Sequence, residues 1–370
     1  MIYKEFKGKK LSMLGMGTMR FPTIGEEVDM EKTAALIDAA IQGGVNYFDT
    51  AWMYHGGKSE SVMGELLSRY PRESFYLASK FPGYDQANID RMEEIFEKQL
   101  EKCRVDYFDF YLFHNLNEGN LDLYLDPKLM NYLLEQKKQG RIRHLGFSVH
   151  GNNETTRRFL ETYAEHLEFC QVQLNYLDWT YQQAKEKVEL LREFGIPVWV
   201  MEPVRGGKLA KLREADEAML KSYRPKESIP AWAFRFLMEI PDVTVILSGM
   251  SDMEQLQDNL KTFGEQKPLS PAEWEMLEQL GRTMIDRVPC TDCRYCTDYC
   301  PQGLEIPRIL RIYREQSFTG TNTIPARAVQ RFEEGKRPTD CIGCRACEAV
   351  CPQNIPISEL MADFSARLSE

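Results

Sequence analysis

Short apolar runs alternate with amphipathic stretches through most of the chain. Between about residue 11 and residue 264, the alternation repeats at intervals of roughly thirty residues. Apolar runs that are separated by stretches with helical periodicity are typical of parallel strands joined by crossover helices. The pattern therefore predicts an α/β fold built on a parallel sheet.

Eight apolar runs are candidate strands of this sheet. They are Leu11–Met16, Asn46–Phe48, Phe75–Ser79, Phe108–Phe113, His144–Phe147, Phe169–Gln173, Val198–Met201 and Val243–Leu247. Eight strands that alternate with helices predict a closed (β/α)8 barrel, the TIM barrel. An open doubly wound sheet is the alternative, but the G-x-G-x-x-G phosphate fingerprint is missing after the first strand, where Leu14–Thr18 reads LGMGT.

Helical stretches separate the candidate strands. They are Met30–Gln42, Ser59–Leu67, Ile89–Cys103, Leu129–Lys138, Glu154–Tyr163, Gln182–Phe194, Pro230–Glu239 and Met253–Phe263. Several are followed by a glycine that can form a left-handed C-cap, such as Gly140 and Gly195. Ahead of the first strand, Lys7–Lys9 separates the runs Ile2–Phe6 and Lys10–Met13, which predicts a hairpin that closes the bottom of the barrel.

The alternation ends near Pro268. There the run Ser270–Glu273 reads SPAE, with an N-cap serine, a proline at the first helical position and a glutamate at the third, and so predicts the start of a helix. This helix leads into a segment that contains eight of the ten cysteines. We therefore expect a barrel over residues 1–267, and a linker helix with a small α-helical domain over residues 268–370.

The eight cysteines form two runs with the same spacing, C-x2-C-x2-C-x3-C-P. The cysteines are Cys290, Cys293, Cys296 and Cys300 in the first run, and Cys341, Cys344, Cys347 and Cys351 in the second. This is the ligand spacing of two [4Fe-4S] clusters, in which the fourth cysteine of each run binds the cluster of the other run. We therefore expect a ferredoxin-like domain that carries electrons, with Cys351 completing the first ligand set and Cys300 the second.

Disulfide bonds and zinc sites are the alternatives. A disulfide framework needs an oxidising compartment, yet Met1–Phe6 contains no apolar signal core. Zinc sites more often use two C-x2-C pairs for each ion, whereas a third cysteine at the same spacing and a fourth before proline match an iron-sulfur cubane better. The other two cysteines, Cys103 and Cys170, lie in apolar contexts and are expected in the core.

Composition and charge narrow the class of protein. Hydrophobic residues make up 43% of the 370-residue chain, which is enough for a sizeable core. No apolar run reaches the length of about eighteen residues that a membrane span needs. The formal net charge of -10 disfavours nucleic acid and anionic membranes as partners, because both require a basic face. We expect a cytoplasmic protein that binds neither.

Ionisable side chains follow three consecutive candidate strands. Asp49 comes after the second strand with Tyr54 five residues later, Lys80 comes after the third, and His114 after the fourth. Because the carboxyl ends of barrel strands surround the active site, we expect the four side chains to converge there. Alone, each has a simpler explanation as a cap, a solvated cation or a hydrogen-bonded core residue. The inference therefore rests on the occurrence of all four, in order, at consecutive strand ends.

These four side chains suit the reduction of a carbonyl group. The Lys80 ammonium is expected to lower the pKa of the Tyr54 hydroxyl, which would protonate the oxygen as hydride reaches the carbon. Asp49 would keep Lys80 charged and oriented, and His114 would align the carbonyl oxygen.

The stretch Gly44–Glu60, which contains Asp49 and Tyr54, resembles the signature of the aldo/keto reductase family. Further matching positions are Lys80, His114, Gly146–Ser148 and Ser248–Ser251. The likeness covers roughly residues 1–265, and with the cysteine runs the whole chain resembles the iron-sulfur branch of this family. The resemblance implies a (β/α)8 barrel, the catalytic set Asp49, Tyr54, Lys80 and His114, and a nicotinamide cofactor across the barrel mouth.

The resemblance also implies cofactor contacts, position by position. These are Gly17, Thr18 and Arg20 beside the nicotinamide and pyrophosphate, Ser148 and Gln173 at the carboxamide, Met201 against the nicotinamide ring, Pro203, Val204, Gly206 and Gly207 along the pyrophosphate, and Ser251, Gln255 and Asn259 at the adenosine end.

The sequence departs from the family pattern at three places. Met201 stands where many members have an aromatic ring. Leu247–Leu260 contains no Lys or Arg for a 2′-phosphate, which leaves the choice between NADH and NADPH open. Three residues separate Cys296 from Cys300 where this branch has a tighter spacing, which leaves the cluster type at that run open.

The leading hypothesis is an oxidoreductase that reduces a small aldehyde or ketone with NADH or NADPH and links two [4Fe-4S] clusters to a one-electron partner protein. Nicotinamide releases two electrons as hydride and each cluster accepts one, so a flavin or a redox-active substrate would have to join them, although no motif indicates a flavin. One alternative is an iron-sulfur electron-transfer protein whose barrel is a docking scaffold or carries a flavin or another redox substrate. The other is that the clusters only staple the C-terminal segment over the barrel.

Overall fold

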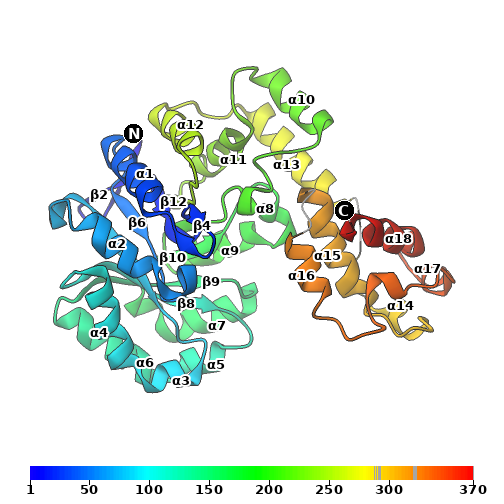
Figure 1. Cartoon of the computed structure of the whole chain (residues 1–370), viewed down its shortest axis with the longest axis horizontal. Coiled ribbons are helices and arrows are strands. Elements are labelled where there is room, and N and C mark those ends of the chain that lie inside the picture. The colour runs from blue at the N-terminus through cyan, green and yellow to red at the C-terminus, as the bar shows by residue number, and fades with distance from the viewer. Residues whose placement is uncertain (287, 289, 291–292, 320–322, 370) are drawn as a thin grey trace. The chain divides into compact units, whose positions relative to one another are not determined.

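The computed structural model describes residues 1–286, 288, 290, 293–319 and 323–369 (Figure 1). Backbone contacts divide the chain into two units. The barrel unit comprises Met1–Gly206 and Lys226–Glu275, and the cysteine unit comprises Gly207–Pro225 and Met276–Glu370. The segment Gly207–Pro225, which we expected within the barrel domain, thus groups with the C-terminal part of the chain.

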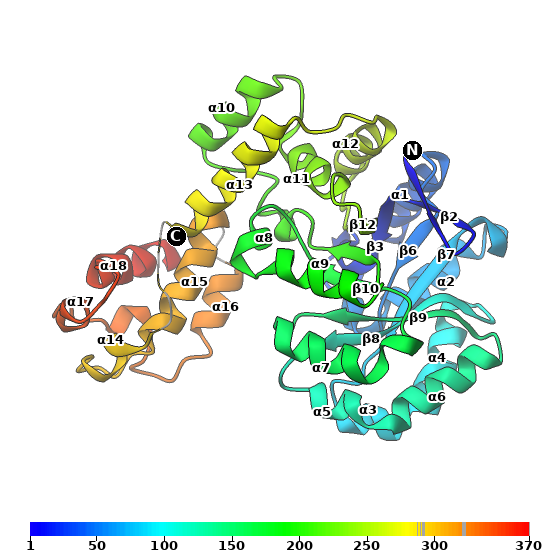
Figure 2. The ribbon, with the colours of Figure 1, turned by 180° about the vertical axis from the view of Figure 1, so that it is seen from behind.

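The barrel unit contains eight parallel strands that close into a barrel, seen inside its ring of helices in Figure 2. The barrel strands are β3 Leu14–Gly17, β6 Tyr47–Asp49, β7 Tyr76–Phe81, β8 Phe108–Leu116, β9 Ile142–Val149, β10 Cys170–Gln173, β11 Val198–Met201 and β12 Val243–Ser248. The last of them, β12, pairs in parallel with the first, β3. The predicted (β/α)8 fold is therefore confirmed, and the open doubly wound sheet is wrong because it would leave these two strands unpaired.

The helices that follow the barrel strands agree closely with those predicted. They are α1 Met30–Gln42, α2 Ser59–Leu67, α4 Met92–Cys103, α6 Pro127–Lys138, α7 Asn153–Tyr163, α9 Ala184–Glu193, α11 Ile229–Met238 and α12 Met253–Gly264. The short helices α3 Gln86–Asp90 and α8 Asp178–Tyr181 directly precede α4 and α9. Helices α8 and α9 are separate because Gln183, which lies between them, has a φ of 52°, in the left-handed region that a helix cannot include.

Several shorter elements complete the chain. They are the helices α5 Leu121–Leu125 and α10 Glu214–Tyr223, the hairpin strands β4 Thr23–Ile24 and β5 Glu27–Val28, and the 3₁₀ turns η1 Thr18–Arg20, η2 Tyr54–Gly57, η3 Arg72–Ser74, η4 Ala164–His166, η5 Arg205–Gly207 and η6 Pro338–Asp340. No helix was expected at α5 or α10.

The predicted hairpin closes the bottom of the barrel. Strands β1 Tyr3–Phe6 and β2 Lys9–Ser12 pair antiparallel around Lys7 and Gly8, whose φ angles of 47° and 76° suit a two-residue turn. Phe6 is buried, with its ring 5.0 Å from that of Trp199 inside the barrel. The first barrel strand therefore begins at Leu14 rather than at Leu11, because Leu11 and Ser12 belong to the hairpin.

The cysteine unit is helical beyond Glu275, as predicted. Its helices are α13 Pro271–Asp286, which begins in the barrel unit, α14 Tyr295–Asp298, α15 Ile306–Thr319, α16 Thr323–Val329, α17 Ala346–Ala349 and α18 Ile357–Leu368. At the start of α13 the predicted capping box is present, because Ser270 N donates to Glu273 Oε2 at 2.7 Å and Glu273 N donates to Ser270 Oγ at 3.3 Å.

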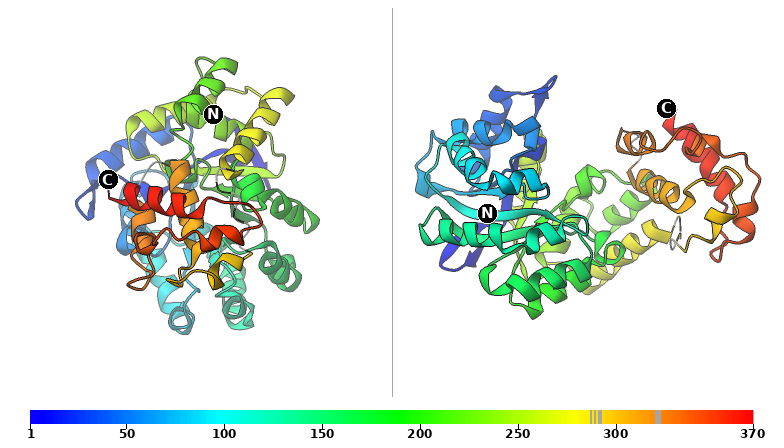
Figure 3. Two further views of the ribbon diagram at one scale, coloured as in Figure 1. Left: turned by 90° about the vertical axis from the view of Figure 1, so that its right-hand side faces the viewer. Right: turned by 90° about the horizontal axis from the view of Figure 1, so that it is seen from below.

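The small core of the cysteine unit joins α15 to α18. Ile309 and Leu310 on α15 are buried together with Met361 and Phe364 on α18. Figure 3 shows these helices packed together in the orange to red part of the ribbon. Within the described residues, no helix is long and apolar enough to cross a membrane.

Gly64 is the point of closest approach between α2 and α4. A Cβ atom at this position would lie 2.1 Å from the carbonyl oxygen of Lys102 and 2.7 Å from the carbonyl carbon of Cys103. Replacing glycine by alanine in a helix normally gains about 1 kcal/mol of stability. Here we predict that Gly64→Ala lowers the free energy of unfolding by about 1–3 kcal/mol, because the backbone of α4 must move.

Urea unfolding of the anaerobically prepared protein measures this effect, and Ser61→Ala, at an exposed position of the same helix, is the control. The control is expected to change the free energy of unfolding by less than about 0.5 kcal/mol. A Gly64→Ala variant as stable as the wild type would show that the two helices are not in contact there.

Candidate functional site

The carboxyl ends of three neighbouring strands carry the four predicted catalytic side chains. Asp49 ends β6, Lys80 is the penultimate residue of β7, and His114 lies near the end of β8. These strands pair in the order β6, β7, β8, and Tyr54 follows β6 in the turn η2. The parallel register therefore brings the four residues to one edge of the barrel, as expected from the sequence.

Lys80 is the centre of this site. Its side chain has no exposure, and its Nζ atom lies 2.5 Å from Asp49 Oδ1, 2.8 Å from the carbonyl oxygen of Thr50 and 3.4 Å from the Tyr54 hydroxyl. An ammonium group has three hydrogen atoms, and each finds an oxygen here. Since Asp49 and Tyr54 raise the pKa of Lys80 against the effect of burial, the lysine stays protonated.

The pKa of Tyr54 differs from the expectation. Burial raises the pKa of the Tyr54 hydroxyl, and this effect exceeds the lowering by Lys80. The expected net lowering is therefore wrong for the protein without ligands, because the neighbouring Asp49 also opposes ionisation. The phenol stays protonated at neutral pH, which is the state a proton donor requires.

His114 lies beside Tyr54 and is neutral. Its ring is 6.0 Å from the Tyr54 ring and 5.7 Å from the Tyr84 ring, edge-on in both cases. Burial, together with the charge of Lys80, lowers the pKa of His114 well below its usual value. Among the described residues, neither His114 Nδ1 nor Asp49 Oδ2 has a hydrogen-bond partner. Polar atoms that are buried without a partner at a strand end are available to a ligand.

A buried polar network beneath the site was not anticipated from the sequence. Glu60 is fully buried and accepts hydrogen bonds from Ser79 Oγ at 2.7 Å and from Gln99 Nε2 at 2.6 Å. Gln99 also donates to the carbonyl oxygen of Lys80 at 3.1 Å. The network therefore fixes the backbone from which the lysine extends. The one signal for it in the sequence is that Glu60, in the first turn of α2, belongs to the stretch Gly44–Glu60.

Three predicted carboxamide and ring contacts lie on the next strands of the barrel. Ser148 is near the end of β9, Gln173 ends β10 and Met201 ends β11, and these strands are neighbours. Ser148 Oγ accepts from the amide nitrogen of Asn115 at 2.8 Å. Gln173 Nε2 donates to Asp178 Oδ2 at 2.9 Å. Both polar side chains therefore already have partners within the barrel.

Arg20, Gly206 and Ser251 come together from three separate segments. Ser251 Oγ donates to the carbonyl oxygen of Arg20 at 2.8 Å, and a Cβ atom on Gly206 would lie 2.8 Å from Arg20 Nη2. Gly17 ends β3 next to this group, whereas Thr18 is fully buried with its hydroxyl 2.7 Å from Ser59 Oγ. Arg20 thus contacts Ser251 through its backbone and lies beside Gly206 through its guanidinium, whose Nη2 is also 3.8 Å from Glu202 Oε1, whereas the Thr18 side chain points inward.

The other predicted cofactor residues differ in exposure. Gln255 is exposed and donates to Asp252 Oδ2 at 2.7 Å, and Asn259 is buried and donates to Ser248 Oγ at 3.0 Å. Pro203 is buried and Val204 half-buried, both in the turn after β11. Gly207 is exposed and is the first residue of the cysteine unit.

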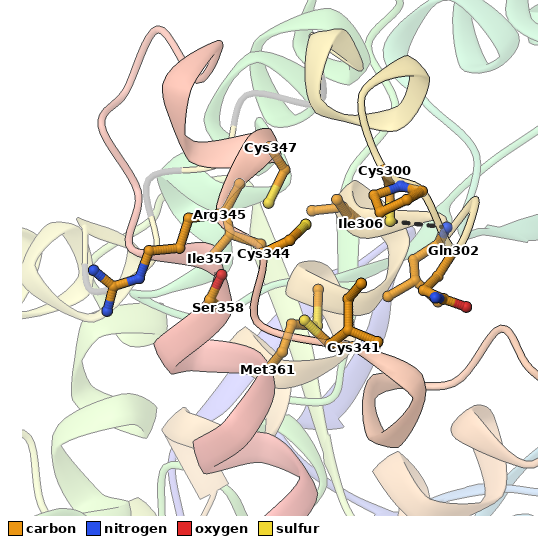
Figure 4. A pocket seen from close by; sticks show the side chains of 13 residues that line it. Cys300, Gln302, Ile306, Cys341, Cys344, Arg345, Cys347, Ile357, Ser358 and Met361 are labelled. Atoms are coloured by element: carbon orange, nitrogen blue, oxygen red, sulfur yellow. Dashed lines mark hydrogen bonds between the residues drawn. The ribbon is translucent and has the colours of Figure 1, made fainter.

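The cysteines line two cavities, each with members of both runs. One cavity is lined by Cys300, Cys341, Cys344 and Cys347, whose sulfur atoms face a common space in Figure 4. The other is lined by Cys290, Cys293, Cys296 and Cys351. This is the exchange of fourth cysteines that the spacing predicts.

The two cavities fit clusters better than single ions. Among the described residues, no three His, Cys, Asp or Glu side chains converge closely enough to hold one metal ion. Burial, followed by the neighbouring Cys290, raises the pKa of Cys296 to about 11. Burial, followed by Glu348, raises the pKa of Cys347 to about 12. Thiolates are therefore unfavourable here without a cationic group, which an iron-sulfur cluster would supply.

Comparisons with known proteins agree with this geometry. The model of the aldo/keto reductase family matches residues 13–282, and that of a 4Fe-4S dicluster domain matches residues 289–355. An NADH-specific methylglyoxal reductase of Escherichia coli is 24% identical over 74% of this chain and 96% of its own length. L-galactose dehydrogenase of Arabidopsis thaliana is 23% identical over 71% of this chain and 87% of its own length.

Solved structures give the same result for the barrel. An aldo-keto reductase from Bacillus halodurans, in its holo form, has a TM-score of 0.60 and 25% identity, and covers 74% of this chain and 93% of its own. An aldo/keto reductase from Klebsiella pneumoniae, in complex with NADP and acetate, has a TM-score of 0.61 and covers the same shares, but at 21% identity it supports the fold alone.

The contribution of the buried Asp49–Lys80 ion pair to stability can be tested by substitution. Lys80→Met leaves the Asp49 carboxylate buried without its cation, and we expect a loss of about 3–5 kcal/mol in the free energy of unfolding. The double variant Asp49→Asn/Lys80→Met removes both charges at nearly constant volume and is expected to be more stable than Lys80→Met alone. Urea unfolding of the three proteins measures both changes.

The loss of stability caused by Lys80→Met should depend on pH. Burial already raises the pKa of Asp49, and removing the lysine raises it further. The folded variant therefore favours protonated Asp49, so its stability falls as the pH rises from about 4, the pKa of an unfolded aspartate. A double variant that is less stable than Lys80→Met at neutral pH would contradict the assignment of these charges.

Proposed function

The chain belongs to the aldo/keto reductase family and is an oxidoreductase, and we propose that it reduces an aldehyde or ketone by hydride transfer from a nicotinamide cofactor. The observation that carries the proposal is Lys80 Nζ between Asp49 Oδ1 and the Tyr54 hydroxyl, at the carboxyl edge of the barrel. The neutral imidazole of His114 beside Tyr54 gives a second polar group at the same edge.

Each residue has a role that its environment supports. Tyr54 donates its proton to the carbonyl oxygen, because burial keeps the phenol protonated until a base is formed next to it. Lys80 then stabilises the phenolate by charge, and Asp49 keeps the lysine in place. His114, as a neutral ring, hydrogen-bonds the carbonyl oxygen and sets its direction.

The remaining strand ends suit a nicotinamide cofactor, which would supply the hydride when bound. Ser148, Gln173 and Met201 occupy the three strands after His114, where the carboxamide and ring are proposed to lie. The Arg20 guanidinium lies beside Gly206, where the absent side chain lets it approach the backbone of the turn, and Ser251 Oγ holds the Arg20 backbone. The segment 247–260 has no Lys or Arg, so Arg20 is the cation that we propose for the phosphate groups.

We also propose that the cysteine unit holds two [4Fe-4S] clusters that exchange single electrons with a partner protein. Both cavities have four cysteines, and Ile357 lines both of them, so the two clusters would be separated by little more than one side chain. Hydride carries two electrons and each cluster carries one. We therefore propose that a redox-active carbonyl substrate, or a flavin, joins the two kinds of step.

The role of Tyr54 is tested by Tyr54→Phe. We expect the rate of carbonyl reduction, measured with methylglyoxal and with either NADH or NADPH, to fall by about 10²–10⁴, because the proton donor is lost. Binding of the nicotinamide, followed by fluorescence, and the iron content should stay unchanged. Tyr84→Phe is the matched control. The Tyr84 ring also contacts His114, but its hydroxyl has no role in the proposed proton transfer. Full activity in Tyr54→Phe would exclude this role.

The pairing of cysteines is tested by iron content and EPR spectra of anaerobically prepared variants. Cys351→Ala should lose about half of the iron, because it opens one cluster of two. Adding Cys290→Ala should lower the iron no further, since both cysteines line the same cavity. Adding Cys341→Ala instead should remove nearly all of it, since Cys341 lines the other cavity. The reverse pattern would mean that the fourth cysteines do not cross between runs.

A further inference from the structure

The turn η2, which begins at Tyr54, has an unfavourable backbone. The three residues after the tyrosine, His55, Gly56 and Gly57, have φ angles of 52°, 62° and 88°. Left-handed backbone is unfavourable for a residue with a side chain, such as His55, and glycine adopts many other conformations equally well. The turn therefore needs contacts with the rest of the barrel unit to keep this shape.

Lys102, in the last turn of α4, makes two such contacts, one on each side of Tyr54 in the sequence. Its Nζ atom donates to the carbonyl oxygen of Gly57 at 3.1 Å and lies 3.9 Å from the centre of the Trp52 ring. Trp52 comes two positions before Tyr54, and Gly57 comes three positions after it. An ammonium group over an indole ring is attracted by the negative face of the ring, in addition to its hydrogen bond. The lysine thus holds the chain before and after the tyrosine.

The same ammonium group is paired with the buried Glu60. Lys102 Nζ lies 3.6 Å from Glu60 Oε2, and the two side chains are 26% and 0% exposed. A buried carboxylate is unfavourable unless a cation or hydrogen bonds compensate its charge. The other oxygen of Glu60 accepts from Ser79 and Gln99, and Gln99 bonds the carbonyl oxygen of Lys80. One ammonium group therefore contacts both the turn η2 and the network that fixes the backbone of Lys80.

We propose that Lys102 is a positioning residue for Tyr54, and that it sets the distance between the tyrosine hydroxyl and the Lys80 ammonium. This distance is 3.4 Å. Lys102 acts on it through the turn η2 and through Glu60. Because a hydrogen bond and the attraction between charges both weaken with distance, a displaced turn makes Lys80 less able to stabilise the phenolate. The inference rests on the proposed function, since it concerns Tyr54 as the proton donor.

The first test follows the position of Tyr54 without any substrate. Fluorotyrosine is placed at residue 54 of the anaerobic holoprotein, and its ¹⁹F NMR signal is compared between variants. We expect Lys102→Met to move this signal towards that of the urea-unfolded protein, because the turn is no longer held in one conformation. Lys102→Arg keeps the charge, a donor for Gly57 and the contact with the Trp52 ring, and should keep the signal close to that of the wild type.

The second test is turnover of methylglyoxal with NADH or NADPH. Lys102→Met should lower kcat about tenfold or more and leave KM within about twofold, because the proton donor is misplaced while the other contacts of the substrate remain. Lys102→Arg should recover most of kcat. If Lys102→Met does not fold, Lys102→Met/Glu60→Gln removes the unpaired buried charge as well and still lacks the contacts with Gly57 and Trp52. Iron content should match the wild type in all variants.

A matched control lies on the same helix. Lys98 pairs with Glu94 at 2.9 Å and is half exposed, so Lys98→Met removes a cation from α4 without touching the turn, and should change neither the ¹⁹F signal nor kcat.

An unchanged ¹⁹F signal in Lys102→Met would show that the inference is wrong and that the contacts of His55 with Thr18 and Phe21 hold the turn. A displaced signal with an unchanged kcat, or an equal displacement in Lys98→Met, would contradict it too. A wild type that reduces no carbonyl compound would instead overturn the proposed function, and the ¹⁹F comparison would still decide whether Lys102 positions Tyr54.

Discussion

A lysine ammonium that is out of contact with water needs oxygen atoms around it, and here three lie within reach of Lys80. Two of them, on Asp49 and Thr50, come from the end of β6, and the third is the hydroxyl of Tyr54. Without the carboxylate, burial would drive the lysine towards its neutral form. The charge that can stabilise a phenolate therefore exists only because β6 and β7 are adjacent in the barrel.

The same constraint explains the polar network beneath the site. Lys80 can reach Asp49 only if its own backbone is fixed, and Gln99 from α4 bonds the carbonyl oxygen of that residue. Glu60 on α2 in turn accepts from Gln99 and Ser79. A charged site at the rim of the barrel thus depends on two helices outside it, which gives the close packing of α2 on α4 at Gly64 a role in the position of the site.

The cysteine unit has a comparable dependence on distant partners. Each run supplies three cysteines to one cavity and the fourth to the other, so each cavity is formed only when both runs come together. Burial of thiols at both cavities opposes their ionisation, so a cluster that binds there has to displace their protons and offset this cost with its own positive charge. The unit is too small for a large apolar core, and ligand bonds across it would replace the missing packing energy.

Local patterns in the sequence determined the barrel strands, most helix boundaries, the capping box at Ser270, the four residues at the strand ends and the exchange of fourth cysteines. Each of these features follows from hydrophobic periodicity, from capping residues or from a fixed spacing of residues. Such patterns involve only a few neighbouring residues, or strands whose pairing order is known for the fold. The tertiary structure alone decided the rest. The pKa of Tyr54 depends on burial, which overrides the nearby Lys80. Glu60, Gln99 and the hydrogen bond of Lys102 to Gly57 depend on contacts between segments 39 to 45 positions apart, and no local pattern reports which distant side chain will fill the space beside them.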